Sequence, residues 1–274
     1  GTVIRLAFSL PHLARTIRAE NQWLRGFCRD NQVDAIISDN RYGLWHPEIP
    51  SYLITHQLAV KSPLGAWSEA PVRRQIYRYI NRFTACWVPD YPEKDRSMAG
   101  DLAHPRQVPE TPVHYIGPLT RIRPQQAGAP LIIGTTSLHQ IQLLVILSGP
   151  EPQRTILEQR VIHAWKQNPG RSLLLVRGLP HLPISPLPEL PNAVVVNHLE
   201  TDQLSQAIAN SSAVLSRSGY SSIMDLLPHH SNIWMVPTPG QTEQEYLALY
   251  LSGKGRIQAQ QQDQFDLSRI LAST

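Results

Sequence analysis

The chain has 274 residues, of which 42% are hydrophobic and 17% charged, a balance that is typical of globular proteins and excludes a disordered chain. The net charge is only +4, yet residues 1–128 carry 16 basic and 11 acidic side chains, whereas residues 129–274 carry 9 and 10. The first half is therefore the half expected to meet an anionic partner, a membrane surface or a nucleic acid, and the alternative is ordinary solvated surface charge. The two cysteines, Cys28 and Cys86, have no metal-binding spacing, which indicates a reducing, cytoplasmic compartment.

The first half alternates helical patterns with short apolar runs. The predicted elements are, in chain order, a helix within residues 4–27, strands at 33–38 and 52–55, a helix over about 70–83, and strands at 85–88 and 113–119. Strands separated by helices predict a parallel sheet. Because this half begins on a helix, we expect a Rossmann-like domain that lacks its first strands.

Residues 120–130 mix Pro, Gly, Gln and charge without periodicity, which is typical of a linker. Beyond them the predicted elements are strand 143–147, helix 152–167, strands 173–176 and 194–196, helix 202–210, strand 214–215, a helix from 221, strand 233–236, helix 242–251 and a strand near 256–258. This alternation is typical of a doubly wound sheet. The predicted fold class is α/β with two Rossmann-like domains, residues 1–123 and 130–274.

Ligands of open α/β sheets bind beyond the carboxyl ends of the strands, so the turns after predicted strands are candidate sites. In residues 148–154, Gly149 and Arg154 flank a helix start that can bind phosphate, with Pro152 expected as the first helical residue. The alternative there is a tight structural turn. His198 follows another strand and is a candidate nucleobase contact, or a structural histidine.

Two further turns combine glycine with polar side chains. Residues 216–225 suit a pyrophosphate beside a ribose, and residues 237–246 suit a sugar read by planar amide and carboxylate groups. The candidate side chains in these turns are Arg217, Ser218, Gly219, Tyr220, Ser221, Ser222, Asp225, Gln241, Gln244 and Glu245. The alternative for Ser221, Ser222 and Asp225 is that they merely cap the helix and complement its dipole.

The second pair of turns resembles the C-terminal domain of GT-B glycosyltransferases of family 28. Arg217-Ser218-Gly219 with Asp225, followed by residues 237–246 with Gln244-Glu245, is similar to that family's Arg-Ser-Gly…Glu and Pro…Gln-Gln-Tyr signature. The family includes the N-acetylglucosamine transferase of lipid-linked peptidoglycan synthesis. The resemblance implies that the first helix start holds the donor's pyrophosphate, the acidic residue binds the ribose, and the Gln pair reads the donor sugar.

This sequence departs from the family pattern at three places. The glycine-rich turn is replaced by residues 148–152, the family's acidic residue is Asp225, and its second Gln is Glu245. No Asp-x-Asp occurs, so we expect no metal and no cofactor, with helix N-termini and arginine neutralising the nucleoside diphosphate. The family's base-bearing loop is absent, and His56 and Asp39, each after a predicted strand, are the candidate bases.

Residues 73–83 join four arginines to apolar and aromatic residues without an acid. Such a helix can lie on anionic lipid, which predicts a peripheral membrane protein with a membrane-borne acceptor, or it is an ordinary amphipathic helix with its arginines outward. No nucleic-acid motif is present. The leading prediction is a transferase that moves a sugar from a UDP-type donor to an acceptor hydroxyl. The alternatives are a nucleotide-sugar hydrolase or epimerase, and a non-catalytic nucleotide-sugar-binding protein.

Overall fold

The structure, a computed structural model, describes residues 2–61, 66–168, 170–182, 190 and 192–274. The chain forms two compact units, residues 1–118 and 119–274. None of the described helices is both long and apolar enough to cross a bilayer.

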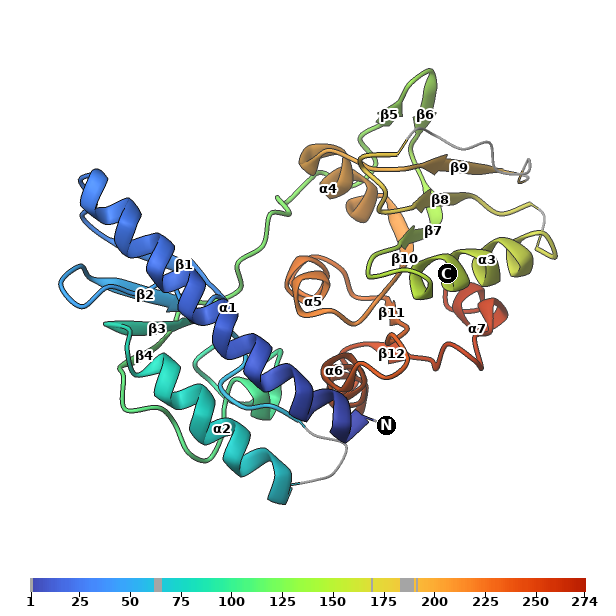
Figure 1. Ribbon diagram of the computed structural model, residues 1–274. Helices are drawn as coiled ribbons and strands as arrows, with labels where there is room; N and C mark the ends of the chain where they lie inside the picture. Colours follow the sequence, from blue (N-terminus) through green and yellow to red (C-terminus); the bar gives the residue numbers. More distant parts are fainter. Residues whose placement is uncertain (1, 62–65, 169, 183–189, 191) are drawn as a thin grey trace. The chain divides into compact units, whose positions relative to one another are not determined.

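The first unit is a parallel α/β layer (Figure 1). Its elements are α1 (Thr2–Asp30), β1 (Ile36–Asp39), β2 (Ser51–Ile54), α2 (Ala66–Ile80), β3 (Ala85–Val88), the 3-10 turn η1 (Gly100–Leu102) and β4 (Val113–Tyr115). The sheet order is β1-β2-β3-β4, and all three pairings are parallel. The observed strand β4 is shorter than the strand predicted over residues 113–119.

Burial explains why these segments pack as they do. Leu53 and Val88 from the strands and Ile80 from the end of α2 are completely buried. On α1, Asn21 Nδ2 donates to the carbonyls of Gly43 (3.0 Å) and Trp45 (2.7 Å), which anchors the helix to the loop after β1. The unit therefore has a core of its own.

The second unit contains a six-stranded, fully parallel sheet. Its elements are β5 (Leu131–Ile133), β6 (Thr136–Leu138), β7 (Ile141–Ile146), α3 (Gln153–Trp165), β8 (Leu173–Val176), β9 (Ala193–Val196), α4 (Thr201–Ala209), β10 (Ser211–Ser216), α5 (Tyr220–Leu226), β11 (Ile233–Met235), α6 (Thr242–Gly253), β12 (Gln258–Ala259) and α7 (Leu267–Leu271). The sheet order is β12-β11-β10-β7-β8-β9. Counted from β7, this is the Rossmann order 3-2-1-4-5-6.

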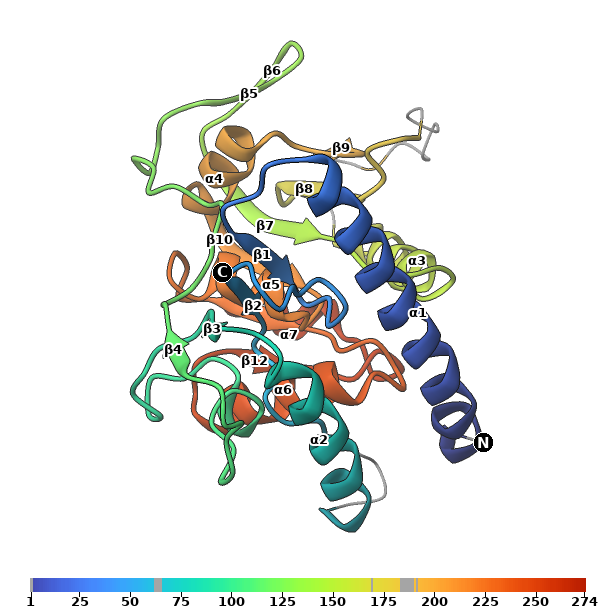
Figure 2. The ribbon, with the colours of Figure 1, turned by 60° about the vertical axis from the view of Figure 1, so that its left-hand side comes forward.

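The strand order reverses between β7 and β10, which lie side by side at the centre of the sheet (Figures 1 and 2). One face packs against α3 and α7, with Trp165 of α3 completely buried against Leu143 and Ile270. On the sheet, α4 contacts β7 and β10. The predicted α/β class with a doubly wound second half is confirmed.

Three features of the second unit differ from the sequence expectation. The segment expected as a linker is held on this unit, because the Gly128 amide donates to Asn210 Oδ1 (2.9 Å) and the Arg123 amide to Ser205 Oγ (3.2 Å). The antiparallel hairpin β5–β6 was not predicted. In addition, Pro152 precedes α3, whose first helical residue is Gln153.

Candidate functional site

The carboxyl ends of β7, β10 and β11 bring three loops together. Gly149, after β7, has φ +98°, a conformation that favours glycine. A Cβ placed on Gly149 would lie 3.9 Å from Oγ1 of Thr238, which follows β11. Because β10 lies between β7 and β11, these two loops approach each other over the end of β10. This is the point of strand reversal at which doubly wound sheets bind ligands.

The loop after β10 joins the same cluster. Ser218 Oγ donates to the carbonyl of Gln244 (2.8 Å), and a Cβ on Gly219 would lie 4.0 Å from Gln244 Nε2. Gly219 has an extended conformation and immediately precedes α5. Candidate residues from two separate sequence turns therefore lie next to each other.

The amide and carboxylate side chains at the start of α6 brace their own loop. Gln244 Oε1 accepts from the Thr238 amide (2.9 Å), while Gln244 Nε2 donates to Gln241 Oε1 (2.6 Å). Glu245 Oε1 accepts from the Gly240 amide (2.9 Å). These contacts fix the loop between β11 and α6, and sugar recognition by the same side chains stays a prediction.

Three buried polar atoms at this edge have no hydrogen-bond partner: Ser216 Oγ, Arg217 Nε and Thr238 Oγ1. Leaving such an atom unpaired costs about 1–3 kcal/mol. The two hydroxyls lie at the loops that meet at the strand reversal, whereas Arg217 Nε lies beneath those loops. Ser216 and Thr238 were not among the predicted site residues. Their position as the last residue of β10 and the third residue after β11 is the signal that would have found them.

Arg217 lies beneath the loops and not among them. It is 1% exposed, and its two terminal nitrogens donate to backbone carbonyls and to one side-chain amide. Burial lowers the pKa of its guanidinium to about 10. Its terminal nitrogens are therefore directed into the protein, and direct contact of Arg217 with the donor stays a prediction.

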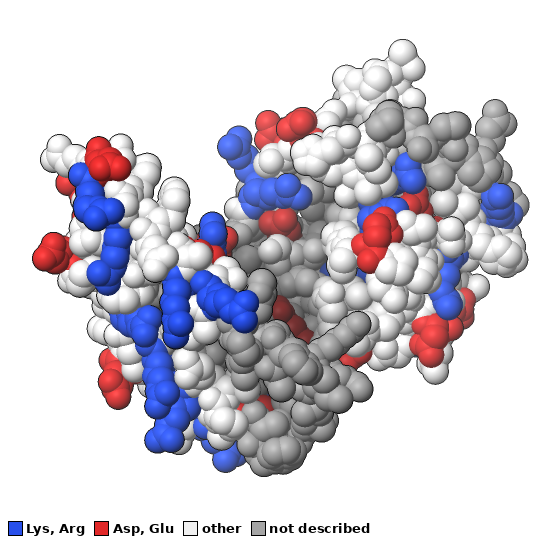
Figure 3. Space-filling model, in the orientation of Figure 1, with Lys and Arg blue, Asp and Glu red and all other residues white. Residues whose placement is uncertain are grey.

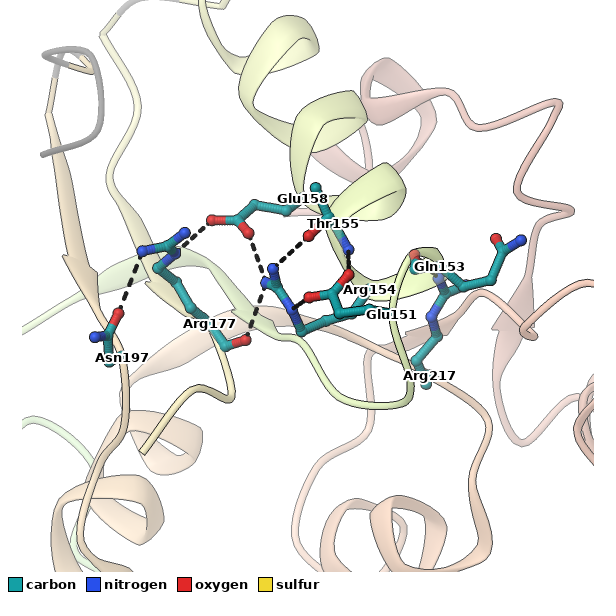
Figure 4. A network of polar contacts seen from close by, with 8 residues as sticks. All are labelled: Glu151, Gln153, Arg154, Thr155, Glu158, Arg177, Asn197 and Arg217. Atoms are coloured by element: carbon teal, nitrogen blue, oxygen red, sulfur yellow. Dashed lines mark hydrogen bonds and ion pairs between the residues drawn. The ribbon is translucent and has the colours of Figure 1, made fainter. Parts of the chain in front are cut away.

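The side chain of Arg154 also bonds to other protein groups, in a network at the ends of β7, β8 and β9 (Figure 4). Arg154 Nη1 donates to Glu158 (2.5 Å) and Arg154 Nε to Glu151 (2.6 Å). Arg177 Nε also donates to Glu158 (2.5 Å), and its Nη1 to Asn197 Oδ1 (3.3 Å). Burial alone would lower the pKa of Arg154, but the bonds to Glu158 and Glu151 raise it. The expected role of Arg154 at a phosphate is not supported by these contacts.

Asp225, the predicted ribose ligand, is partly buried on α5. Its Oδ1 accepts from Thr120 Oγ1 (2.8 Å) and from the Arg121 amide (3.3 Å), and its Oδ2 lies 3.4 Å from Arg121 Nε. Asp225 therefore also holds the segment that begins the second unit.

The other predicted donor contacts lie on separate elements. Tyr220, Ser221 and Ser222 form the first turn of α5, with Tyr220 buried and Ser221 exposed. His198 follows β9, is 42% exposed at its side chain, and has Glu200 Oε1 3.9 Å from its Nε2. The structure thus groups the Gly219 and Gln244 turns and leaves His198 on the β9 side of the sheet.

The two candidate bases lie at the carboxyl edge of the first unit's sheet. Asp39 is the last residue of β1 and pairs in register with Ile54 of β2, two residues before His56. Asp39 is exposed and His56 is half-buried. Among the residues that the structure describes, no three His, Cys, Asp or Glu side chains are grouped so as to hold a metal ion.

Comparison with known proteins finds a likeness in part of the second unit. Residues 191–273 match the glycosyltransferase family 28 C-terminal domain. No curated protein matches the chain in sequence.

Solved structures match over nearly the whole chain. They include the glycotransferase of kitacinnamycin (17% identity, TM-score 0.66, 95% of this chain and 72% of that chain) and Acinetobacter baumannii MurG (13%, 0.53, 95% and 68%). The spinosyn rhamnosyltransferase SpnG, solved with thymidine diphosphate, matches at 14% identity and TM-score 0.54, over 95% and 70% of the two chains. The chain therefore has the GT-B fold, and residues 191–273 of its second unit are similar to the glycosyltransferase family 28 C-terminal domain.

Proposed function

We propose that the chain is a glycosyltransferase whose second unit binds a nucleoside diphosphate sugar, of the uridine type, at the carboxyl ends of β7, β10 and β11. The observation that carries the proposal is the meeting of the loops after β7, β10 and β11 at the point of strand reversal, where the hydroxyls of Ser216 and Thr238 have no partner in the protein. The family 28 match over residues 191–273 and the GT-B fold support it. One structural neighbour, SpnG, was solved with thymidine diphosphate.

The loops supply the contacts that such a donor needs. Gly149 and Gly219 leave the backbone open to phosphate oxygens, and the hydroxyls of Ser216 and Thr238 add donors. The carboxylate of Asp225 accepts hydrogen bonds from the ribose hydroxyls once Thr120 and Arg121 release it. No metal or cofactor is part of this proposal, since backbone amides and arginine charge can stabilise the leaving diphosphate.

Transfer to an acceptor hydroxyl also requires a base. The hydroxyl oxygen attacks the anomeric carbon, the bond to the diphosphate breaks, and a base takes the hydroxyl proton. Asp39 and His56 are the proposed candidates, on the basis of their place at a carboxyl edge of the first unit. His56→Ala at wild-type turnover would exclude His56 from this role.

We propose that the acceptor is anionic or carried on an anionic lipid surface, with the protein peripheral to it on the cytoplasmic side. A groove of about 710 Å³ lies along α2, lined by Arg73, Arg74, Tyr77 and Arg78 among others. Ile80 is buried while Arg74 and Arg78 are exposed, so the helix is amphipathic with its arginines outward. Figure 3 shows basic side chains gathered on this unit. Salt-sensitive flotation with anionic vesicles, lost on Arg74→Glu with Arg78→Glu, tests the lipid surface.

Calorimetric titration with uridine, thymidine, guanosine and adenosine diphosphates tests the donor site. We expect one nucleotide to bind, and Asp225→Ala to weaken it about tenfold through loss of charge-assisted hydrogen bonds. Asp202→Ala is the matched control, because Asp202 also pairs with an arginine of the segment that begins the second unit, Arg123 at 3.7 Å, but is 74% exposed on α4. Equal affinity of the Asp225→Ala protein, or no nucleotide binding at all, contradicts the assignment.

Product analysis then separates the activities. Transfer predicts a glycosylated acceptor and free nucleoside diphosphate. Free sugar without acceptor would instead indicate hydrolysis, and a changed sugar still attached to the nucleotide would indicate epimerisation. Binding with no turnover in any acceptor mixture would indicate a binding protein.

A further inference from the structure

Arg217 ties together segments that are far apart in sequence. Its Nη1 donates to the carbonyls of Val236 and Pro237 (both 3.2 Å), at the end of β11. Its Nη2 donates to the carbonyl of Gln153 (2.6 Å), the first residue of α3, and to Gln262 Oε1 (2.5 Å), beyond β12. The loops after β7, β11 and β12 are therefore held by one side chain that itself follows β10.

All of these partners are neutral. No carboxylate among the described residues forms an ion pair with Arg217, although its guanidinium is 1% exposed. Even with a pKa lowered to about 10 by burial, the group is protonated at neutral pH. The positive charge is therefore present without compensation, in surroundings that screen it weakly.

The other buried arginine at this edge is different. Arg154, 5% exposed, contacts both Glu151 and Glu158, so its charge is balanced within the protein. A buried charge without a partner is costly, and proteins keep such a group where a ligand supplies the missing opposite charge. The orphaned Nε of Arg217 is a second sign that the group is not fully satisfied by the protein.

We propose that Arg217 is a positioning residue that acts on the donor's diphosphate from beneath the crevice: it fixes the loops after β7 and β11 and supplies positive charge without touching the ligand. This inference rests on the proposed donor site. It predicts that the site binds a nucleoside diphosphate more tightly than the nucleoside alone. The charge contributes to binding of the phosphates but not of the nucleoside, because only the phosphates are anionic.

The test compares binding of a nucleoside diphosphate with binding of its nucleoside, in wild type, Arg217→Gln and Arg217→Lys. Wild type is expected to bind the diphosphate far more tightly than the nucleoside. In Arg217→Gln the ratio of diphosphate affinity to nucleoside affinity is expected to fall at least tenfold, while the affinity for the nucleoside changes less than twofold. Arg217→Lys keeps the charge and is expected to retain most of that ratio. Arg171→Gln is the matched control, since Arg171 lies before β8 at the opposite edge and donates to Leu271.

The outcomes are distinguishable from failure of the proposed function. If wild type binds no nucleoside diphosphate, the donor site itself is wrong. If wild type binds it and Arg217→Gln keeps the ratio, or weakens nucleoside and diphosphate equally, the inference about Arg217 is overturned. If Arg217→Gln does not fold, the Arg217→Lys protein alone tests the inference. Loss of its preference for the diphosphate over the nucleoside overturns the role of the charge, and a preference close to that of wild type supports it.

Discussion

The two halves of the second sheet's carboxyl edge are built from different interactions. On the β7–β8–β9 side, Glu158 lies between Arg154 and Arg177, so buried charges neutralise one another. On the β10–β11–β12 side, Arg217 is surrounded by carbonyl and amide groups, and three buried polar atoms lack partners. The first arrangement is complete within the protein, whereas the second leaves a buried charge and polar groups unpaired, and there we propose that an anionic ligand binds. In this account one side of the edge is a structural brace and the other side is a binding surface.

The largest effect is expected from Glu158→Gln. Removing this carboxylate leaves two buried guanidinium groups without their shared partner, which costs about 3–5 kcal/mol in the free energy of unfolding. Urea denaturation measures the loss. Glu151→Gln is the control, because Glu151 contacts the same Arg154 but is 52% exposed, and it is expected to cost less than about 1 kcal/mol. Equal effects of the two changes would show that the network is no brace.

A smaller loss is expected from Gly178→Ala on the same side. Gly178 has φ +70°, and a Cβ there would lie 2.3 Å from the carbonyl oxygen of Leu147, so the loop after β8 must shift away from the end of β7. We expect a loss of about 3 kcal/mol in thermal or urea unfolding. Gly170→Ala is the control, because Gly170 has φ +96° but a Cβ there would meet nothing within 4 Å. This change measures the cost of the positive φ alone, which is expected to be about 1 kcal/mol. Similar losses at both positions would remove the argument for a close approach.

Thr238→Val tests the opposite side and is expected to leave stability nearly unchanged. The change removes a buried hydroxyl that has no partner, so the free energy of unfolding stays within about 0.5 kcal/mol of wild type or rises, while diphosphate affinity falls severalfold. Thr111→Val is the control: the hydroxyl of Thr111 donates to Ile80 and Phe83 carbonyls, and its loss is expected to cost about 1 kcal/mol. A Thr238→Val protein that is destabilised and binds normally would argue for a structural hydroxyl.

The sequence predicts the layers of this fold well, because strand runs and helical periodicity alternate clearly after residue 140. The hairpin β5–β6 escapes prediction since its strands have three residues each and Ile132 is 61% exposed, which leaves no burial pattern to detect. The segment 120–130 is predicted as a linker because it has no apolar periodicity. Hydrogen bonds to Asn210, Ser205 and Asp225 hold it on the second unit, and such bonds leave no periodic pattern in the sequence.

Site prediction reaches the loops but not the direction in which each side chain points. Motif spacing places Gly219 and Gln244 in adjoining turns, as the structure has them. It cannot show that Arg217 turns inward, because its partners Val236, Gln262 and Gln153 are 19 to 64 residues away. The partners of Arg154, Glu151 and Glu158, lie three and four residues away, within reach of a helix-spacing argument. A basic residue beside a phosphate motif is therefore only a candidate until its partners are known.

The most direct test of the account is amide hydrogen exchange of the wild-type protein with and without a saturating nucleoside diphosphate. The account predicts slower exchange in the loops after β10 and β11, residues 217–225 and 237–245, with no change at residues 177–182 after β8. Protection confined to residues 177–182, with residues 217–225 unaffected, would contradict the division of this edge into a brace and a binding surface.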